Sequence, residues 1–280
     1  MIRVALLVAL AMLAFAANSV LCRLALANTA IDPASFSLVR LASGAVSLGV
    51  IAFLQKKKPS GSWRGALALL GYAVAFSFAY VSLGAGTGAL LLFGAVQATM
   101  VLAGVLRGEH PMPLQWLGLV LALVGLAVLV APGVTAPPLL GALLMLGSGV
   151  AWGLYSILGR SAGDPVAANA GNFLRAAPLA LVPLLGMVLS GNVSTDSRGL
   201  ALAVASGAVA SGMGYALWYA VLPHLSAARA ASVQLSVPVI TALGAVLFLG
   251  EGISLRLTLA SLAVLGGIAL VIKGQRKLRK

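Results

Sequence analysis

Three side-chain amides that lie deep inside long apolar stretches are the first candidates for chemistry in this chain. They are Asn18, Gln97 and Gln234. Polar groups at such positions face a cavity or another helix, because lipid offers them no hydrogen bond. An amide both donates and accepts hydrogen bonds, which suits a zwitterionic ligand. We expect the three amides to line a cavity, and an ordinary hydrogen bond between helices is the alternative.

Aromatic residues accompany these amides in the apolar stretches. Phe76 and Tyr80 are four residues apart and share one face of a helix, and Trp152 and Tyr155 are three residues apart. Trp218 follows Phe76 by 142 residues, and the same offset separates Arg107 from Leu249. We expect these five rings to line the same cavity, where they could stack against an aromatic ligand. Packing between helices is the alternative use of each ring.

Other residues of the apolar stretches are expected to serve the membrane interface. Trp63, Tyr72 and Trp116 suit interfacial aromatic belts. Arg40 and Arg175 lie about two turns into their stretches, and we expect their side chains to extend to the nearest interface. The alternative for both arginines is a pair with an acid or with the carboxylate of a substrate.

Three prolines fall inside apolar stretches, at positions 178, 183 and 238. Each proline removes a backbone hydrogen bond and can kink its helix. We expect Pro238 to act as a gating bend, and a static kink is the alternative.

Composition explains why these residues must be considered inside a membrane. The chain has 280 residues, of which 61% are hydrophobic and only 8% charged, with a mean hydropathy of +1.09. Soluble domains carry about 25% charged residues, so a soluble enzyme is excluded, and so is a disordered chain. The net charge of +13 comes from residues between apolar stretches, where it indicates topology rather than nucleic-acid binding.

The apolar stretches predict an all-α integral membrane protein with ten transmembrane helices. A bilayer core of about 30 Å needs about 20 apolar residues per helix. The predicted helices span about 4–22, 34–54, 65–83, 86–106, 113–131, 138–158, 166–189, 199–222, 229–249 and 255–272. The first is expected to remain as a helix and not to be cleaved as a signal peptide.

The distribution of basic residues predicts that both termini lie in the cytoplasm. With that orientation four basic residues fall outside: Arg23, Arg40, Arg198 and Arg256. Fourteen fall inside: Arg3, Lys56, Lys57, Lys58, Arg64, Arg107, Arg160, Arg175, Arg229, Lys273, Arg276, Lys277, Arg279 and Lys280. This bias fits the positive-inside rule.

The two halves of the chain carry matching landmarks in the same order. These are FAANSVLCR (15–23) with WGLYSILGR (152–160), Asp32-Pro33 with Asp164-Pro165, Arg40 with Arg175, and Arg107-Gly-Glu109 with Leu249-Gly-Glu251. They predict a first repeat over 1–134 and a second over 135–280. Five helices per repeat give the repeats opposite orientations, an architecture of secondary transporters that expose a midplane site alternately to each side. Glu109 and Glu251 are expected to stabilise helix starts or to pair with basic residues.

Residues for other chemistries are missing from the sequence. There is one cysteine, Cys22, and both histidines, His110 and His224, fall in connections, so we expect no metal and no catalytic residue. No P-loop is present, no cofactor is expected, and none of the five acids lies near a helix centre. We therefore expect no buried carboxylate to couple transport to protons. A membrane enzyme, a channel and a scaffold remain as less favoured alternatives.

The C-terminal stretch SVPVITALGAVLFLGEGISLRLTLASLAVLGGIALVI resembles the end of the second repeat in EamA-like transporters of the drug/metabolite transporter superfamily. The stretches AWGLYSILGRSA and GYALWYAVLPHLSAARAASVQLSVPV resemble, more specifically, YddG-type aromatic amino acid exporters. The resemblance implies that helices one to four and six to nine enclose a central cavity, with helices five and ten at the periphery.

The resemblance also implies a function and a location. It implies export of aromatic and other neutral amino acids from the cytoplasm across a bacterial inner membrane. An exporter of other small metabolites or of hydrophobic drugs is the alternative. The expected partners are a small-molecule substrate and the lipid bilayer, with no nucleic acid. One chain already encloses a path, which favours a monomer, and a dimer through the peripheral helices stays open.

Overall fold

The computed structural model describes residues 2–108, 110–133, 136–159, 163–221, 224–225 and 233–277. All regular secondary structure in this part of the chain is helical, as the composition predicts. The helices are α1 (Ile2–Asn28), α2 (Pro33–Leu54), α3 (Trp63–Tyr80), α4 (Ala85–Leu106), α5 (Pro113–Val130), α6 (Leu139–Gly159), α7 (Pro165–Leu179), α8 (Leu181–Leu189), α9 (Ser197–Val204), η1 (Ala205–Met213), α10 (Gly214–Val221), α12 (Ser236–Leu249) and α13 (Leu255–Lys277).

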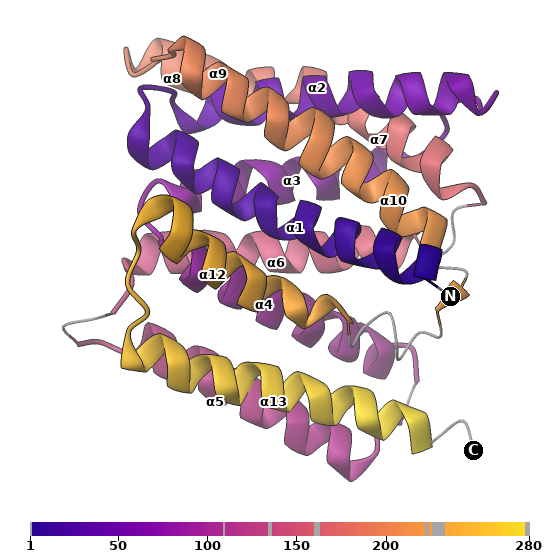
Figure 1. Cartoon of the computed structure of the whole chain (residues 1–280), viewed down its shortest axis with the longest axis vertical. Coiled ribbons are helices and arrows are strands. Elements are labelled where there is room, and N and C mark those ends of the chain that lie inside the picture. The colour runs from indigo at the N-terminus through magenta and orange to yellow at the C-terminus, as the bar shows by residue number, and fades with distance from the viewer. Residues whose placement is uncertain are drawn as a thin grey trace.

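Eight helical segments of the described chain are long and apolar enough to cross a membrane. They are Arg3–Asn28, Pro33–Leu54, Ala85–Leu106, Pro113–Val130, Leu139–Gly159, Pro165–Leu189, Ser197–Val221 and Leu255–Gly274. The shorter apolar helix α12 and the 18-residue α3 lie among them in the bundle (Figure 1). The chain is therefore a multi-pass membrane protein.

The starts of α2 and α7 follow from their sequences. Asp32 accepts hydrogen bonds from two backbone N–H groups of the first turn of α2, and Asp164 accepts one from the N–H of Ala167 in α7. A proline directly follows each acid, at the first helical position, where its missing N–H has no cost. The helix starts predicted from these two Asp-Pro pairs are confirmed.

Two of the predicted helices are not regular over their length. The stretch 166–189 breaks at Ala180, between α7 and α8. Pro183 is the third residue of α8 and cannot donate to the carbonyl of Leu179, which explains the break. The stretch 199–222 contains the nine-residue π-helix η1 between α9 and α10. The predicted start of the next helix, 229–232, lies outside the described residues.

Helices α5 and α13 pack against each other along one edge of the bundle (Figure 1). The contact is close because two glycines face each other. A Cβ atom added to Gly118 would lie 2.4 Å from the carbonyl oxygen of Gly267, and a Cβ on Gly267 would lie 2.4 Å from the carbonyl oxygen of Gly118. Small residues allow membrane helices this approach.

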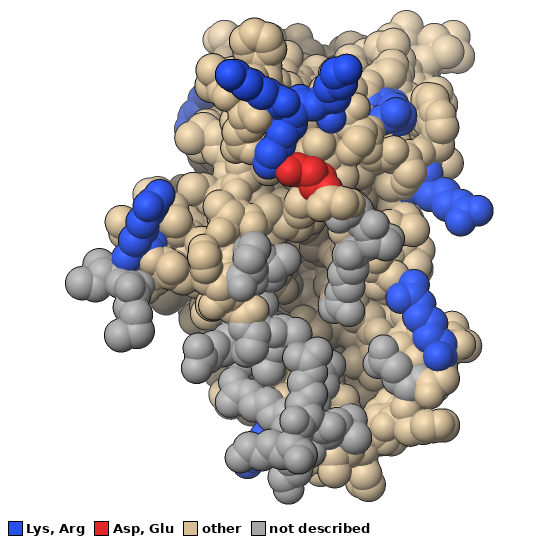
Figure 2. All heavy atoms as spheres, turned by 90° about the vertical axis from the view of Figure 1, so that its right-hand side faces the viewer, with Lys and Arg blue, Asp and Glu red and all other residues tan. Residues whose placement is uncertain are grey.

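The remaining helices form the body of the bundle. Helix α1 packs against α10 and α12, α6 packs against α3 and α4, and α2 packs against η1 and α7. Helix α1 begins and α13 ends at the same end of the bundle (Figure 1). Figure 2 shows this end face, on which Lys and Arg side chains are spread widely and acidic side chains show at one place.

Candidate functional site

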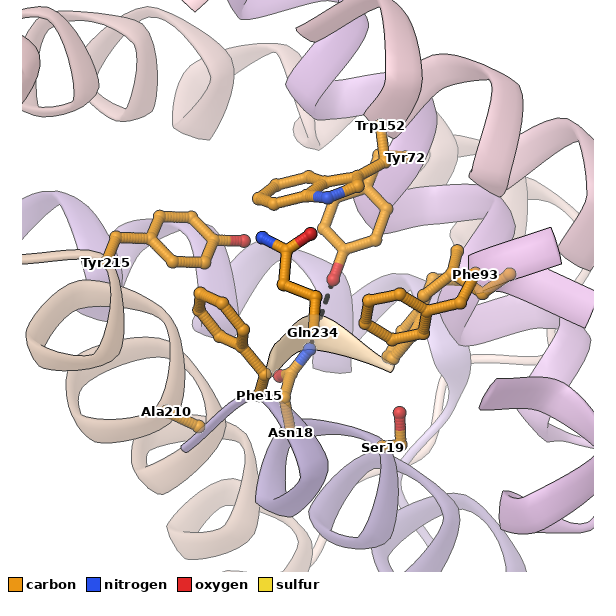
Figure 3. A pocket seen from close by; sticks show the side chains of 11 residues that line it. Phe15, Asn18, Ser19, Tyr72, Phe93, Trp152, Ala210, Tyr215 and Gln234 are labelled. Carbon is orange, nitrogen blue, oxygen red and sulfur yellow. Dashed lines mark hydrogen bonds between the residues drawn. The ribbon is translucent and has the colours of Figure 1, made fainter. Parts of the chain in front are cut away.

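A small cavity lies in the body of the bundle, where helices from both halves of the chain meet. Its volume is about 30 Å³, which holds a water molecule or two but not an amino acid. A larger ligand could enter only if the helices separate. The cavity is lined by Phe15, Asn18, Ser19, Tyr72, Phe76, Leu92, Phe93, Trp152, Ala210, Tyr215 and Gln234 (Figure 3).

A chain of hydrogen bonds runs along one wall of the cavity and connects α1, α2, α3 and η1. The side-chain amide of Asn18 donates to the hydroxyl of Tyr72 over 3.1 Å and accepts from the hydroxyl of Ser206 over 2.7 Å. The guanidinium of Arg40 donates to the same Tyr72 hydroxyl over 2.8 Å. The Tyr72 hydroxyl therefore accepts two hydrogen bonds within reach of the cavity.

Aromatic rings cluster around Trp152 at the cavity. The ring centre of Trp152 lies 4.7 Å from that of Tyr72, 5.2 Å from that of Tyr215 and 5.4 Å from that of Tyr155. Phe15 meets Tyr215 edge to face at 5.8 Å. Figure 3 shows the side-chain amide of Gln234 pointing toward Trp152 and the hydroxyl end of Tyr215. The cavity thus combines flat apolar surfaces with a few hydrogen-bonding groups, which is typical of small-molecule sites.

Arg40 and Tyr72 are not at the membrane interface, and both sequence-based expectations for them are wrong. Arg40 is only 1% exposed, with its guanidinium carbon 4.9 Å from the ring centres of both Tyr72 and Phe76. Tyr72 is 4% exposed and lines the cavity. The cause is tertiary: α2 packs against α3 and η1, and Arg40 and Tyr72 point toward each other where α2 meets α3.

The predicted cavity residues divide into two groups. Asn18, Phe76, Trp152 and Gln234 line the cavity. The other four are Tyr80, Gln97, Tyr155 and Trp218, none of which is among its lining residues.

Each residue of the second group has another place in the bundle. The hydroxyl of Tyr80 donates to the carbonyl of Ala85 over 3.3 Å, and the hydroxyl of Tyr155 donates to the side-chain carbonyl of Asn169. Trp218 packs beside Phe15 in a neighbouring apolar cluster, and Gln97 is half-buried in α4.

Pro238 is the third residue of α12, so it follows a helix start rather than interrupting a regular helix. It cannot donate to the carbonyl of Gln234 four residues earlier. Helical geometry is interrupted at Leu235, next to this carbonyl. This interruption lies beside the cavity residue Gln234. That Pro238 acts in gating stays a proposal.

Several cavity residues were missed by sequence reasoning. Phe15 corresponds to Trp152 in the repeated motif FAANSVLCR and WGLYSILGR, so the repeat itself could have identified it. Ala210 and the nearby Ser206 and Ser211 come from η1. The sequence of η1, ASGAVASGM, consists mainly of small residues and does not predict a π-helix.

Ionisable groups outside the spans stabilise helix ends and connections. Glu251 accepts from Arg23 and from the backbone N–H of Ala85 at the start of α4, so the expectation that it would cap or pair is confirmed. The Lys57 side chain, 2.7 Å away, lowers the pKa of Asp164. The backbone N–H of Gly199 lowers the pKa of Asp196 at the start of α9. Glu109 lies outside the described residues.

The cavity has the means to bind a ligand by stacking and hydrogen bonds. Its lining residues include no carboxylate, histidine or cysteine. Within the described part of the chain, no three His, Cys, Asp or Glu side chains come together as ligands for a metal.

Comparison with known proteins agrees with this architecture. A crystal structure superposes on the chain with a TM-score of 0.65 at 22% sequence identity, covering 94% of this chain and 98% of that one. This likeness shows the shared fold.

Two relatives extend the comparison. Uncharacterized protein PA1977 of Pseudomonas aeruginosa is 59% identical over 273 residues, covering 96% of this chain and 94% of that protein. A probable terminal-alkyne amino-acid exporter of Streptantibioticus cattleyicolor is 29% identical over 218 residues, covering 76% and 72%. The model of the EamA-like transporter family matches residues 2–131 and again 139–273. The chain belongs to the EamA-like transporter family.

Proposed function

We propose that this protein exports amino acids, with aromatic and other neutral ones favoured, across a bacterial inner membrane by alternating access. Two inverted five-helix repeats, 1–134 and 135–280, make up a ten-helix bundle with both termini in the cytoplasm. The observation that carries the proposal is the cavity, because helices of both halves supply its walls. Such a site at the repeat interface can be exposed first to one side and then to the other.

Exchange of the two proposed repeats maps the most extensive helix contacts onto one another. Helix α1 packs against α12 as α6 packs against α4, and α1 packs against α10 as α6 packs against α3. Helix α2 packs against η1 as α7 packs against α3. The pairs α2 with α7, α4 with α12 and α5 with α13 map onto themselves. This pattern is the one that a two-fold relation between the halves would produce, and the two family matches at 2–131 and 139–273 support the same division.

The cavity lining follows the same relation. Phe15 and Trp152 occupy equivalent places in the two motifs that are 137 residues apart, and both line the cavity. Leu92 and Gln234 are related by the offset of 142 residues, and both line it too. Equivalent walls are what alternating access requires, since one half must take the place of the other when the cavity opens to the opposite side.

An amino acid fits the chemistry of the cavity. The amides of Asn18 and Gln234 offer donors and acceptors, and the rings of Phe15, Trp152 and Tyr215 offer surfaces for an apolar side chain. The relative named as a probable terminal-alkyne amino-acid exporter supports this substrate class. The same aromatic walls would suit other small metabolites or hydrophobic drugs, which form the second candidate substrate class.

The test is uptake of labelled phenylalanine and leucine into proteoliposomes, with and without a pH gradient. The variant is Trp152→Ala, and the matched control is Trp116→Ala, whose indole on the peripheral helix α5 is 42% exposed. We expect wild type and Trp116→Ala to transport both amino acids at similar rates. Trp152→Ala should lower phenylalanine uptake about tenfold, because a stacking surface is lost.

The pH gradient tests the energy source in the same vesicles. The described spans hold no acid at their centres, so uptake should be independent of the gradient. Absence of amino acid uptake by the folded wild type, together with uptake of a hydrophobic drug, would replace the amino acid proposal by the second candidate. Gradient-driven accumulation that vanishes with one buried residue would overturn the uncoupled mechanism.

A further inference from the structure

Arg40 is a positive charge inside the bundle with no negative partner among the residues that the structure describes. It lies in the second turn of α2, about 10 Å from the start of that helix. Its side chain is 1% exposed, and among the described residues no carboxylate oxygen lies within 4.0 Å of its guanidinium. A buried charge is costly unless it is paired, and an ionisable residue at such depth is a sign of function.

The contacts of Arg40 compensate this cost only in part. Nη2 donates to the Tyr72 hydroxyl over 2.8 Å, Nε lies 3.4 Å from the hydroxyl of Ser211, and the faces of Tyr72 and Phe76 lie against the charge. Nη1 is buried and has no hydrogen-bond partner within the described part of the chain. The guanidinium therefore retains donor capacity and its full charge.

The corresponding arginine of the second half is used differently. Arg175 is half-buried, and its Nη1 donates to the backbone carbonyls of Ser60 and Gly171. It thus ties α7 to the connection before α3, a structural role. Arg40 and Arg175 therefore differ in burial and in hydrogen-bond partners, although they occupy matching positions in the two halves of the sequence.

Arg40 is connected to the cavity through two of its lining residues. Tyr72 and Phe76 both line the cavity and both lie against the guanidinium. The Tyr72 hydroxyl accepts from Arg40 on one side and from Asn18, another lining residue, on the other. An anionic group beside Tyr72 and Asn18 would be one hydroxyl group away from the buried charge.

We propose that Arg40 is the specificity-determining charge of the cavity and selects substrates that carry a carboxylate. The carboxylate lies beside Tyr72 and Asn18, with Arg40 acting through the Tyr72 hydroxyl as a positioning residue. The proposal rests on the proposed amino acid transport. The amino group of the substrate then faces the rings of Trp152 and Tyr215, since aromatic faces attract cations.

The experiment compares phenylalanine with phenylalaninamide, which keeps the ring and the amino group but has no carboxylate. Binding of both to the purified full chain is measured by calorimetry, and uptake is measured in proteoliposomes. The variants are Arg40→Gln and Arg40→Lys, and the matched control is Arg175→Gln. The melting temperature of each variant establishes that it is folded.

We expect wild type to bind phenylalanine at least about tenfold more tightly than the amide, the range of a charge-assisted hydrogen bond. Arg40→Gln should weaken binding of phenylalanine about 10- to 100-fold and change binding of the amide less than about twofold. Arg40→Lys should restore part of the preference because it restores the charge. Arg175→Gln should keep the wild-type preference.

The outcomes separate this inference from the proposed function. Wild type that transports phenylalanine and its amide equally well would overturn the role of Arg40 and leave amino acid transport standing. A folded Arg40→Gln variant that still binds phenylalanine more tightly than phenylalaninamide would have the same meaning. Wild type that transports neither compound would overturn the proposed function itself.

Discussion

Arg23 and Glu251 form an ion pair between the first half of the chain and the last connection, with Nε and Oε1 3.0 Å apart. Nη1 of Arg23 also donates to the backbone carbonyls of Tyr80 and Val81, and the second carboxylate oxygen of Glu251 accepts from the backbone N–H of Ala85. One ion pair therefore holds together α1, the end of α3, the start of α4 and the connection after α12. The side chains are 20% and 22% exposed, so water screens the pair only partly.

Loss of this ion pair should destabilise the bundle. In a double-mutant cycle with Arg23→Gln and Glu251→Gln, we expect a coupling of about 0.5 to 3 kcal/mol in the free energy of unfolding, because the two groups are in contact. The measurement is denaturant unfolding in micelles. The control Arg198→Gln removes an exposed charge and should change stability by less than about 0.5 kcal/mol. Strictly additive effects of the two substitutions would contradict the coupling.

The Lys57–Asp164 pair should make stability depend on pH in the acid range. The hydrogen bond from Lys57 lowers the pKa of Asp164 below its ordinary value of 3.8. A lowered native pKa stabilises the folded state above the unfolded pKa, and this contribution is lost as the pH falls through the native pKa. The free energy of unfolding of wild type minus that of Asp164→Asn should therefore be constant from pH 7 to pH 5. This difference should decrease as the pH is lowered past about 3.8.

The expected size of this pH effect is small, because the Asp164 side chain is 38% exposed and solvent screens the pair. Melting temperatures of both proteins across the pH range provide the measurement. A difference that grows as the pH falls below 3.8 would show that the aspartate is not stabilised as the carboxylate.

Close packing of α5 on α13 predicts different effects for two adjacent glycines. A Cβ on Gly267 would lie 2.4 Å from the backbone oxygen of Gly118, whereas a Cβ on Gly266 would have nothing within 4 Å. Gly267→Ala should destabilise the protein by about 1 to 3 kcal/mol through overpacking. Gly266→Ala should be neutral or slightly stabilising, since alanine favours the helix. Equal melting temperatures of the two variants would argue against this contact.

Removal of the Tyr72 hydroxyl should lower the free energy of unfolding more than removal of the hydroxyl of Tyr80, another buried tyrosine. The Tyr72 hydroxyl accepts hydrogen bonds from Asn18 and Arg40, and both donors would lose an acceptor in Tyr72→Phe. We expect a loss of about 1 to 3 kcal/mol, the cost of a buried polar group left unpaired. Tyr80→Phe removes the hydrogen bond of 3.3 Å to the carbonyl of Ala85, which is long, and should lower the stability less. Denaturant unfolding of both variants tests the order, and the reverse order would refute it.

The linear sequence contains local signals for helices and their starts. Apolar stretches separated by charges and turns predict the all-helical membrane fold, because a bilayer requires about 20 apolar residues in each crossing. The Asp-Pro pairs at 32–33 and 164–165 predict two helix starts. The aspartate accepts hydrogen bonds from free backbone N–H groups of the first turn, and the proline has no N–H to leave unpaired. The C-terminal motif indicates the EamA-like transporter family, which the family match confirms.

The cavity depends on contacts that the linear sequence does not specify. An arginine two turns into an apolar stretch gives the same local signal whether its side chain reaches the interface or turns inward, and packing of α2 against α3 and η1 places Arg40 inside. The same holds for Tyr72.

Small residues alone do not predict the π-helix that brings Ser206 and Ser211 to this wall. The sequence by itself therefore determined the apolar helical stretches, two of the helix starts and the family, which rest on composition and neighbouring residues. Only the tertiary structure decided which side chains meet in the cavity, because the rotation and depth of each helix are set by all the helices that pack against it.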